Sequence, residues 1–453
     1  MPNTSDRPNV VLMVSDDHGR DMATYGDTSG ATPNLDALAN GGVTFDNSYC
    51  TTASCAASRS VILTGLYNHT NGTFGHTHDV HHFSCFEDTV TLPALMNDAG
   101  YRTGRVGKTH YAPMDIFPFQ VNDPRGGFGR DDVAMSESCR EFVADGDDPF
   151  FLYWCSHNPH RGGGPIQDHP LKPDRFGNPD EPYPGDEEQL FNEDEIVVPD
   201  YLPDIPETRA ELAQYYQSVA RLDRGVGRLM QILRDTGQYD NTVIMYIADN
   251  GAAFPGAKTN LYEPGANLPL IVRTPDDANR GGRCDGLVTW ADLTPTVIDY
   301  AGSSADPESF HGRSFSGIVD RASPSDWRDE IYLAHTFHEI TNYYPMRIIR
   351  TKRHKFTYNI ASGLQYSFAP DLWAAATWQG TLKHGLKRYG KRKVEDYLHR
   401  PKFELYDLDE DPDELVNLAD KPKYKPLVDK FCMKLRAFQE DTKDPWLHKW
   451  EYE

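Results

Sequence analysis

The sequence predicts an α/β fold with a large, mostly parallel central sheet flanked by helices, followed by a smaller C-terminal α+β domain with an antiparallel sheet. Two observations favour this class. Short apolar runs alternate with helical patterns through the first three quarters of the chain, and after about residue 332 the pattern changes to short strands separated by polar turns. We therefore expect a larger domain over residues 1–335 and a smaller domain over residues 336–453.

The first half of the chain supplies the first strands and helices. The apolar run 9–14 predicts a strand, and Thr-Pro before a helical pattern predicts a helix over 33–40, ended by Gly-Gly. A second short helix is predicted over 91–99, followed by a strand over 101–107. Residues 150–155 are almost continuously apolar, which is typical of a central strand buried on both faces.

A long polar segment interrupts this alternation. Residues 158–207 are rich in Pro, Gly, Asp and Glu, which indicates either a functional lid or a poorly ordered excursion. An amphipathic helix is predicted over 208–235 and a buried strand over 242–248, and two more α/β units extend to about residue 328.

The C-terminal part reads differently. Residues 346–350, 355–358 and 403–408 predict antiparallel strands, and a proline suited to a first helical position starts a closing helix over 426–440.

Charge and composition exclude several classes of partner. With 68 acidic and 45 basic residues the net charge is −23, which repels nucleic acid and anionic membranes. No apolar stretch approaches the ~20 residues of a membrane span. Seven cysteines without paired spacing indicate free thiols in a reducing compartment. The chain as numbered starts without a secretion-signal pattern, so a cytoplasmic location is expected.

Oxygen-bearing side chains follow two of the predicted strands. Asp16 and Asp17 come after the first strand, and Asp249 and Asn250 come after the strand over 242–248. Ligands gather at the carboxyl ends of such strands, and these oxygens suit Ca²⁺, with Mg²⁺ or another divalent cation as the alternative. Either pair taken alone would read as a turn.

Cationic side chains follow the neighbouring strands. Lys108 and His110 follow one strand, His160 and Arg161 follow another, and Lys258 lies shortly after Asn250. A lone histidine is more often structural than catalytic, but this grouping indicates a pocket for a tetrahedral dianion.

Cys55 is the first residue of a stretch that is compatible with a helix, and the N-terminus of such a helix would favour an anion. The alternative for this residue is a buried thiol that acts as a small hydrophobe. Its run, Cys55-Ala-Ala-Ser-Arg59 ending in Thr64-Gly65, resembles the signature Cys-x-(Pro/Ala)-x-Arg of the type I sulfatases. The motifs around Asp16, Lys108, His160 and Asp249 occur in the order found in that family, and several stretches, including residues 79–83 and 259–262, are most similar to its sulfamidase branch.

The resemblance implies a fold, two cofactors and a set of roles. The fold would be the alkaline-phosphatase-like sandwich, and Cys55 would be oxidised after translation, by a formylglycine-generating enzyme, to Cα-formylglycine, whose hydrate attacks sulfur. Ca²⁺ would be held by the side chains of Asp16, Asp17, Asp249, Asn250 and residue 55. Arg59 would orient the formylglycine and His110 would act as its base. The sulfuryl group would be clamped by Lys108, His160 and Lys258.

Two positions depart from the sulfamidase pattern. Asn158 stands where an aspartate is expected and Lys258 stands where an arginine is expected. These differences bear on whether an N-sulfo group is preferred over an O-sulfate.

We expect a polar rim around the clamp that suits a sulfated sugar, with glucosamine N-sulfate first. Its predicted members are His81, His82, Arg161, His338 and Glu339. Three alternatives stay open: a generic aryl or alkyl O-sulfatase, a phosphonate monoester or phosphodiester hydrolase of the same superfamily, and an unconverted protein that only binds sulfated glycans. The number of subunits is also open, with a homodimer as one candidate.

Overall fold

The core of the molecule is one eight-stranded sheet with the strand order β5-β4-β6-β1-β7-β8-β2-β9. The structure is a computed structural model and describes residues 7–123, 129–146, 148–162, 175–276 and 279–452. The sheet strands are β1 (Asn9–Ser15), β2 (Val43–Phe45), β4 (Arg102–Gly107), β5 (Val121–Asn122), β6 (Phe150–Cys155), β7 (Thr242–Ala248), β8 (Leu270–Arg273) and β9 (Gly282–Cys284).

The predicted, mostly parallel sheet is confirmed. Every neighbouring pair is parallel except the two that involve β8, which runs antiparallel to β7 and β2. In the centre, Val14 of β1 pairs with Cys155 of β6, and Ser15 pairs with Ala248 of β7. These three strands therefore end at the same edge of the sheet, and the residues that follow them lie side by side along that edge.

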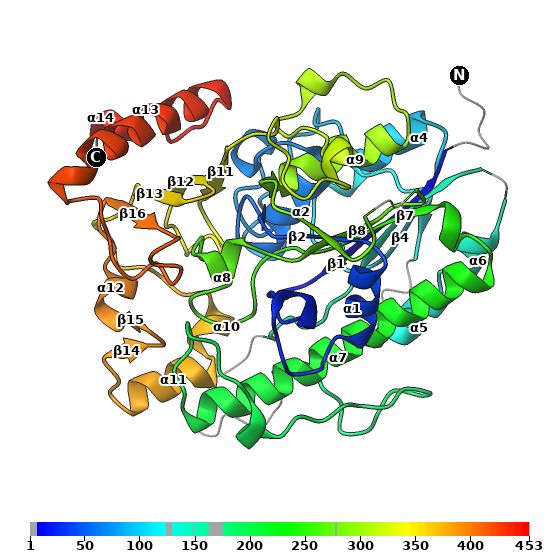
Figure 1. The fold of residues 1–453 in the computed structure, drawn as a ribbon, viewed down its shortest axis with the longest axis horizontal. Coiled ribbons are helices and arrows are strands. Elements are labelled where there is room, and N and C mark those ends of the chain that lie inside the picture. Colours follow the sequence, from blue (N-terminus) through cyan, green and yellow to red (C-terminus); the bar gives the residue numbers. More distant parts are fainter. Residues whose placement is uncertain (1–6, 124–128, 147, 163–174, 277–278, 453) are drawn as a thin grey trace.

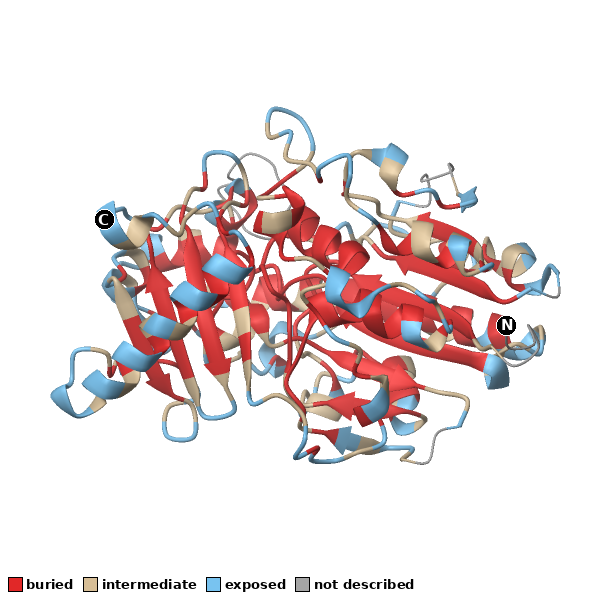
Figure 2. Ribbon diagram, turned by 90° about the horizontal axis from the view of Figure 1, so that it is seen from above, coloured by how far each residue is buried: buried red, intermediate tan, exposed pale blue. Residues whose placement is uncertain are grey.

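Helices cover both faces of this sheet (Figure 1). One layer holds α1 (Pro33–Asn40), α5 (Asp132–Glu137), α6 (Arg140–Ala144) and α7 (Pro206–Asp235), and the other holds α2 (Cys55–Thr64), α4 (Leu92–Asp98) and α9 (Leu293–Tyr300). Alternate residues of β1 belong to two separate apolar cores: Val11 with Leu222 of α7, and Val10 with Val61 of α2. This alternation is the period-two pattern of a strand buried on both faces. Figure 2 shows most of the central strands buried and several helices exposed on one side.

A second, four-stranded antiparallel sheet forms the C-terminal part, in the order β11-β12-β13-β16. Its strands are β11 (Glu330–His335), β12 (Met346–Thr351), β13 (His354–Asn359) and β16 (Phe403–Asp407), and α13 (Lys425–Asp441) packs on it through Phe431 and Leu435. Because β11 pairs with β12, this sheet begins ahead of the boundary expected after residue 335.

The remaining α-helices and strands are short, and short 3-10 helices lie between them. These α-helices and strands are β3 (Ser48–Tyr49), α3 (Asn68–Asn71), α8 (Glu263–Ala266), β10 (Val288–Thr289), α10 (Pro370–Trp373), α11 (Ala376–Lys383), β14 (Arg388–Tyr389), β15 (Arg392–Lys393), α12 (Val394–Leu398) and α14 (Lys449–Tyr452).

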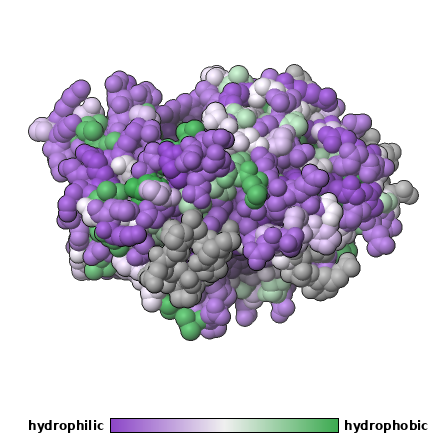
Figure 3. Space-filling view, turned by 90° about the horizontal axis from the view of Figure 1, so that it is seen from below, coloured by the Kyte–Doolittle hydropathy of each residue, from purple (hydrophilic) through white to green (hydrophobic). Residues whose placement is uncertain are grey.

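The polar segment 158–207 lies partly outside the described residues, which omit 163–174. Its later part is tied to α7, because Glu188 pairs with Arg221 at 2.9 Å and Asp186 pairs with Arg224 at 2.5 Å. The face in Figure 3 is mainly hydrophilic, with small scattered apolar patches. Among the helices of the described ranges, none is both long and apolar enough to cross a membrane.

Candidate active site

The predicted oxygen ligands meet at the carboxyl edge of the large sheet. Asp16 and Asp17 follow β1, Asp249 and Asn250 follow β7, and all four side chains are fully buried. Asp17 Oδ1 accepts a hydrogen bond from Asn250 Nδ2 at 2.7 Å, and the Asp17 N–H donates to Asp249 Oδ1 at 3.1 Å. Asp17 has φ 63°, a left-handed conformation that aspartate tolerates better than most residues.

Cationic side chains from other elements contact these carboxylates directly. Arg59 of α2 donates through Nε to Asp249 Oδ2 at 2.9 Å, and Lys108, just after β4, pairs with Asp16. Lys258 Nζ lies 2.9 Å from Asp17 Oδ2. His160 Nδ1, from the loop after β6, lies 2.7 Å from the same oxygen. The structure thus brings together an arginine, two lysines and a histidine that are distant in sequence, and burial lowers the pKa of His160 below its ordinary value.

The balance of burial and charge differs among the three carboxyls. Burial alone would raise the pKa of Asp16, but Lys108 and His160 outweigh it and hold that pKa below its ordinary value. At Asp17, burial would likewise raise the pKa of the carboxyl group, but Lys258 and His160 outweigh burial and lower that pKa. At Asp249 burial prevails over Arg59, with Asp16 adding to it, and the pKa rises to about 7.

The donor set fits a divalent cation. Asp16 Oδ1 and Asn250 Oδ1 are buried and accept no hydrogen bond from any described residue. Ligand atoms of Asp16, Asp17, Cys55 and His160 lie within 4.8 Å of one another. The carboxylates of this cluster and the Asn250 amide, with one unused oxygen on Asp16 and one on Asn250, are hard oxygen donors of the kind that Ca²⁺ and Mg²⁺ prefer.

Cys55 is the first residue of α2 and is fully buried beside this cluster. Its Sγ lies 3.5 Å from Asp17 Oδ1. Burial, and then the Asp17 charge, raise the pKa of the thiol well above its ordinary value, so an unmodified Cys55 is a neutral thiol and a poor nucleophile. In a converted enzyme the Sγ position would be taken by an oxygen of formylglycine.

His110 lies beside the clamp and contacts other histidines. Its Nε2 is 2.9 Å from His78 Nδ1, and its Nδ1 is buried without a partner among the residues that the structure describes. Burial, followed by the charge of Lys108, lowers the pKa of His110 well below its ordinary value. The ring is therefore a neutral imidazole at neutral pH.

The predicted rim residues lie in two segments that meet. His81 Nδ1 accepts from the Ile340 N–H at 3.2 Å, and His338 Nδ1 lies 3.0 Å from Ser54 Oγ, immediately before Cys55. Burial, with Asp371 adding to it, raises the pKa of Glu339 to about 7. His82, by contrast, is exposed.

Arg161 does not fit the predicted rim. Its side chain is 1% exposed and pairs with Glu211 of α7, while its Nε donates to the Ala253 carbonyl at 2.9 Å. Glu211 also accepts from the Ala376 N–H at 2.8 Å, at the start of α11. Through Nε and Nη1, Arg161 therefore ties the loop after β6 to α7 and to the loop after β7.

Asn158, one of the two departures noted in the sequence, is fully buried outside the cluster. Its Nδ2 donates to Asp132 Oδ2 at 2.9 Å and its Oδ1 accepts from Ser218 Oγ at 3.0 Å. The side chain of Asn158 thus braces the loop after β6, and its backbone carbonyl accepts from the Asp16 N–H at 3.1 Å.

Sequence reasoning missed three neighbours of the site. Asp371 of α10 pairs with Lys258 at 2.9 Å and comes from the C-terminal part, where no motif singled it out. His76 and His78 lie beside His110, and their His-x-His spacing was a signal that could have found them.

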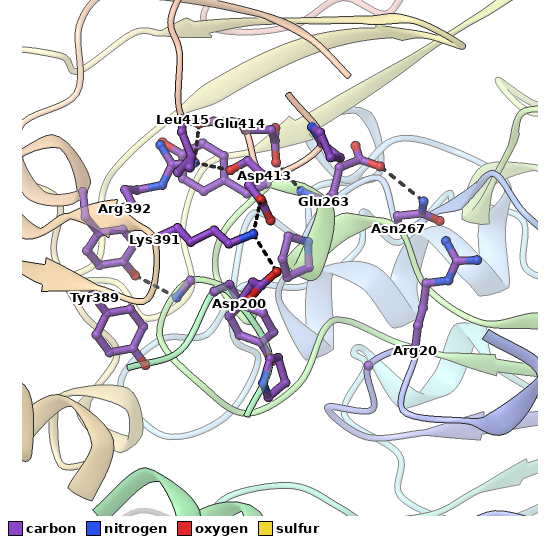
Figure 4. Close-up of a pocket in the computed structure, with 18 of the residues that line it drawn as sticks. Arg20, Asp200, Glu263, Asn267, Tyr389, Lys391, Arg392, Asp413, Glu414 and Leu415 are labelled. Carbon is purple, nitrogen blue, oxygen red and sulfur yellow. Dashed lines mark hydrogen bonds and ion pairs between the residues drawn. The ribbon is translucent and has the colours of Figure 1, made fainter. Parts of the chain in front are cut away.

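A separate cavity of about 350 Å³ lies between the loop after β1 and the C-terminal part. Lys391 reaches both Asp200, at 2.6 Å, and Asp413, at 2.7 Å, and Arg392 stacks on Tyr262 (Figure 4). None of the described residues that line the cavity is a predicted site residue.

The fold and the buried cluster define a class of protein: an α/β protein whose sheet edge gathers buried carboxylates and cationic side chains that could hold a divalent cation. The family model described as Sulfatase matches residues 8–303, and the model described as N-sulphoglucosamine sulphohydrolase, C-terminal, matches residues 257–369. The chain belongs to the sulfatase family and is a sulfuric ester hydrolase.

Individual relatives agree with this membership. The chain is 34% identical to the N-sulphoglucosamine sulphohydrolase of Homo sapiens, over 97% of this chain and 91% of that protein. It is 26% identical to an arylsulfatase of Clostridium perfringens, over 93% and 92%. A solved structure in complex with D-glucosamine-2-N,6-O-disulfate superposes with a TM-score of 0.68 at 22% identity, covering 97% of this chain and 99% of that one.

Proposed function

We propose that this sulfatase removes the sulfo group from an amino sugar, with glucosamine N-sulfate as the preferred substrate and a simple O-sulfate ester as the second. The observation that carries the proposal is the near full-length match to the human N-sulphoglucosamine sulphohydrolase. A solved relative whose substrate is D-glucosamine-2-N,6-O-disulfate supports the same substrate class.

Ca²⁺ is the metal that we propose for the oxygen cluster. Asp16, Asp17, Asp249 and Asn250 would hold it, since these are the residues whose oxygens meet there. When bound, the ion would neutralise part of the negative charge on the sulfuryl oxygens.

We further propose that Cys55 is converted to formylglycine. When hydrated, this group supplies the hydroxyl that attacks sulfur. The surrounding side chains would orient it: Arg59 lies on the same helix and is fixed by Asp249, and the buried start of α2 excludes bulk water from residue 55.

The clamp would be made by Lys108, Lys258 and His160. Burial opposes the charged form of both lysines, but Asp16 at Lys108, and Asp17 with Asp371 at Lys258, raise their pKa values above the ordinary value. Both ammonium groups are therefore charged at neutral pH. Fixed cations in a buried site stabilise the charge that develops on the sulfuryl oxygens and the leaving atom.

His110 would move the proton. As a neutral imidazole with its Nδ1 buried and unpaired among the described groups, it has a lone pair available to take a proton from the hydroxyl at residue 55.

The test has two arms. Intact-mass measurement on the full chain should find residue 55 as formylglycine, lighter than the cysteine form. Converted enzyme should then be assayed on glucosamine N-sulfate, glucosamine 6-O-sulfate, an aryl sulfate and a phosphonate monoester.

We expect the highest kcat/KM on the N-sulfate. Preference for the aryl sulfate would refute the amino-sugar proposal while leaving a sulfatase, and preference for the phosphonate would refute sulfo transfer as the main reaction. A chain that keeps its thiol and turns over none of the four would be a glycan-binding protein instead.

A further inference from the structure

A group of three histidines lies beside the sulfate clamp, and only His110 among them has a role in the proposed function. His76 and His78 come from the loop after α3, and His110 comes from the loop after β4. One nitrogen of each ring lies within 4.8 Å of a nitrogen of the other two. The ring centroids of His76 and His110 are 4.8 Å apart, and those of His78 and His110 are 4.9 Å apart.

Hydrogen bonding within the protein does not use up these nitrogens. His78 Nδ1 and His110 Nε2 are 2.9 Å apart, so one can donate to the other. His76 Nδ1 and His110 Nδ1 are buried and have no partner among the described residues. A cluster kept only for structure would be expected to satisfy such buried nitrogens.

We propose that His76, His78 and His110 form a binding site for a transition-metal ion of the zinc type, and that an ion bound there stops turnover. Three imidazoles with an open fourth position are a common ligand set for Zn²⁺. The inhibitory half of the proposal rests on the proposed function, in which His110 takes a proton; the binding half does not.

The surroundings support an ion at this position. The His78 side chain is 49% exposed, so an ion can reach the site from solvent, whereas His76 is 7% exposed and would form its floor. His78 Nε2 lies 3.8 Å from an Asp79 carboxylate oxygen, which can orient the ring as such carboxylates do in metal sites. The nearby Lys108 and Lys258 are each paired with aspartate, which reduces their repulsion of a cation.

Two further histidines border the cluster without joining it. The ring centroids of His338 and His76 are 3.9 Å apart, but His338 Nδ1 already contacts Ser54, and His81 Nδ1 already accepts from Ile340. These contacts fix the neighbours and leave three rings for the ion.

A metal ion bound to either ring nitrogen would prevent His110 from acting as a base. If the ion takes Nδ1, it takes the lone pair directly. If it takes Nε2, the proton of the neutral ring must sit on Nδ1, which then can only donate.

The test uses full-length, Ca²⁺-saturated protein, so that the oxygen cluster is already filled. Co²⁺ is the spectroscopic probe, because tetrahedral nitrogen ligation gives visible absorption, and Zn²⁺ affinity is measured by competition with a chromophoric chelator. The variants are His76→Gln and His78→Gln. The matched control is His399→Gln, whose side chain is 53% exposed and, like that of His78, lies near a carboxylate, 4.0 Å from Glu395.

We expect wild type and His399→Gln to bind one Co²⁺ with this absorption. Each cluster variant should bind Zn²⁺ weaker by about tenfold or more, since loss of a ligand costs at least as much as loss of an orienting partner. Micromolar Zn²⁺ should lower kcat in wild type and much less in His78→Gln. No Co²⁺ signal, or equal Zn²⁺ affinity in wild type and both cluster variants, would overturn the site.

The two proposals fail separately. A protein inactive on every sulfated substrate but with histidine-dependent Co²⁺ binding would refute the proposed function and keep the metal site. An active enzyme that binds Zn²⁺ through these histidines without inhibition would refute the inhibitory role.

Discussion

At the scale of single residues, the site is organised around Asp17. Its carboxylate contacts Asn250, His160 and Lys258 within 2.9 Å, and its neighbour Asp16 contacts Lys108. One carboxylate thus touches groups from two different loops, the one after β6 and the one after β7. A substitution of Asp17 should therefore disturb the proposed metal ligands and the sulfate clamp at the same time.

Lys258→Ala should reduce kcat/KM by a factor that corresponds to about 2–4 kcal/mol, the range for loss of one buried donor to a developing negative charge. Lys258 is 1% exposed and paired with both Asp17 and Asp371, so its charge is fixed in place. Steady-state kinetics on the preferred substrate measures the loss. Lys391→Ala, in the separate cavity, is the control and should keep wild-type kinetics. An effect under about twofold at Lys258 would contradict its place in the clamp.

Asn250→Ala should weaken Ca²⁺ binding while the fold is kept. The Oδ1 atom of Asn250 is buried and accepts no hydrogen bond within the described ranges, which suits an atom reserved for a cation. Calorimetric titration of metal-free protein with Ca²⁺ should find affinity lowered by about tenfold or more. Unchanged affinity would mean that the cation binds elsewhere.

Much of this site could be predicted from the sequence, because its residues directly follow apolar strands. Asp16, Lys108, His160 and Asp249 were found in this way. Asp371 could not be found, since it reaches Lys258 from α10, more than a hundred residues away, with no strand before it. The burial of Arg161 was not predicted, because a position after a strand does not reveal whether a side chain turns outward or into the core.

At the scale of elements, strands buried on both faces were the easiest to predict. The strand over 242–248 and the strand over 150–155 have the predicted bounds, because continuous apolar runs leave little choice of face. The direction of β8 was not predicted, since an apolar run carries no information about whether it pairs parallel or antiparallel. The sequence also did not predict that the antiparallel sheet starts at Glu330. The first strand of this sheet, β11, is defined by its pairing with β12, which lies later in the chain.

Arg161→Ala should lower the free energy of unfolding by about 3–5 kcal/mol, because it leaves Glu211 buried without its cation. Both side chains are 1% exposed. Urea unfolding followed by fluorescence measures the change. The control is Arg209→Ala, which breaks the more exposed pair with Asp204 and should cost clearly less than Arg161→Ala. If Arg161→Ala keeps its stability and raises only KM, the rim prediction was right after all.

The buried pair Arg347–Asp444 ties β12 to the segment after α13, with Arg347 Nη2 2.9 Å from Asp444 Oδ1. Burial alone would raise the pKa of Asp444, but the Arg347 guanidinium outweighs burial and lowers that pKa below its ordinary value of 3.8. A lowered folded-state pKa gives stability that is present above pH 3.8 and is lost as the pH falls through the folded value.

Asp444→Asn should therefore be less stable than wild type by about 3–5 kcal/mol near pH 7, since Arg347 loses a buried partner. The gap between the two proteins should narrow as the pH falls below 3.8. Unfolding free energies at several pH values measure it. A gap that stays constant down to pH 3 would mean that the charge of Asp444 contributes nothing.

At the scale of the whole molecule, the net charge of −23 opposes the approach of any sulfated substrate. The clamp attracts it only at short range, because Lys108 and Lys258 are buried and paired with aspartates. Long-range repulsion is screened by salt far more than contacts inside a buried site, with a Debye length of about 30 Å at 0.01 M and about 10 Å at 0.1 M.

Raising NaCl from 0.01 to 0.15 M should therefore increase kcat/KM by about twofold or more and leave kcat nearly unchanged. The measurement is steady-state kinetics at saturating Ca²⁺ on glucosamine N-sulfate and on its 2-N,6-O-disulfate. The disulfate carries more charge, so its kcat/KM should rise more steeply with salt. If kcat/KM instead falls with salt, and falls most for the disulfate, the field at the mouth of the site is positive. In that case the acidic surface faces away from the path by which the substrate enters, and local cations such as Lys108 control its approach.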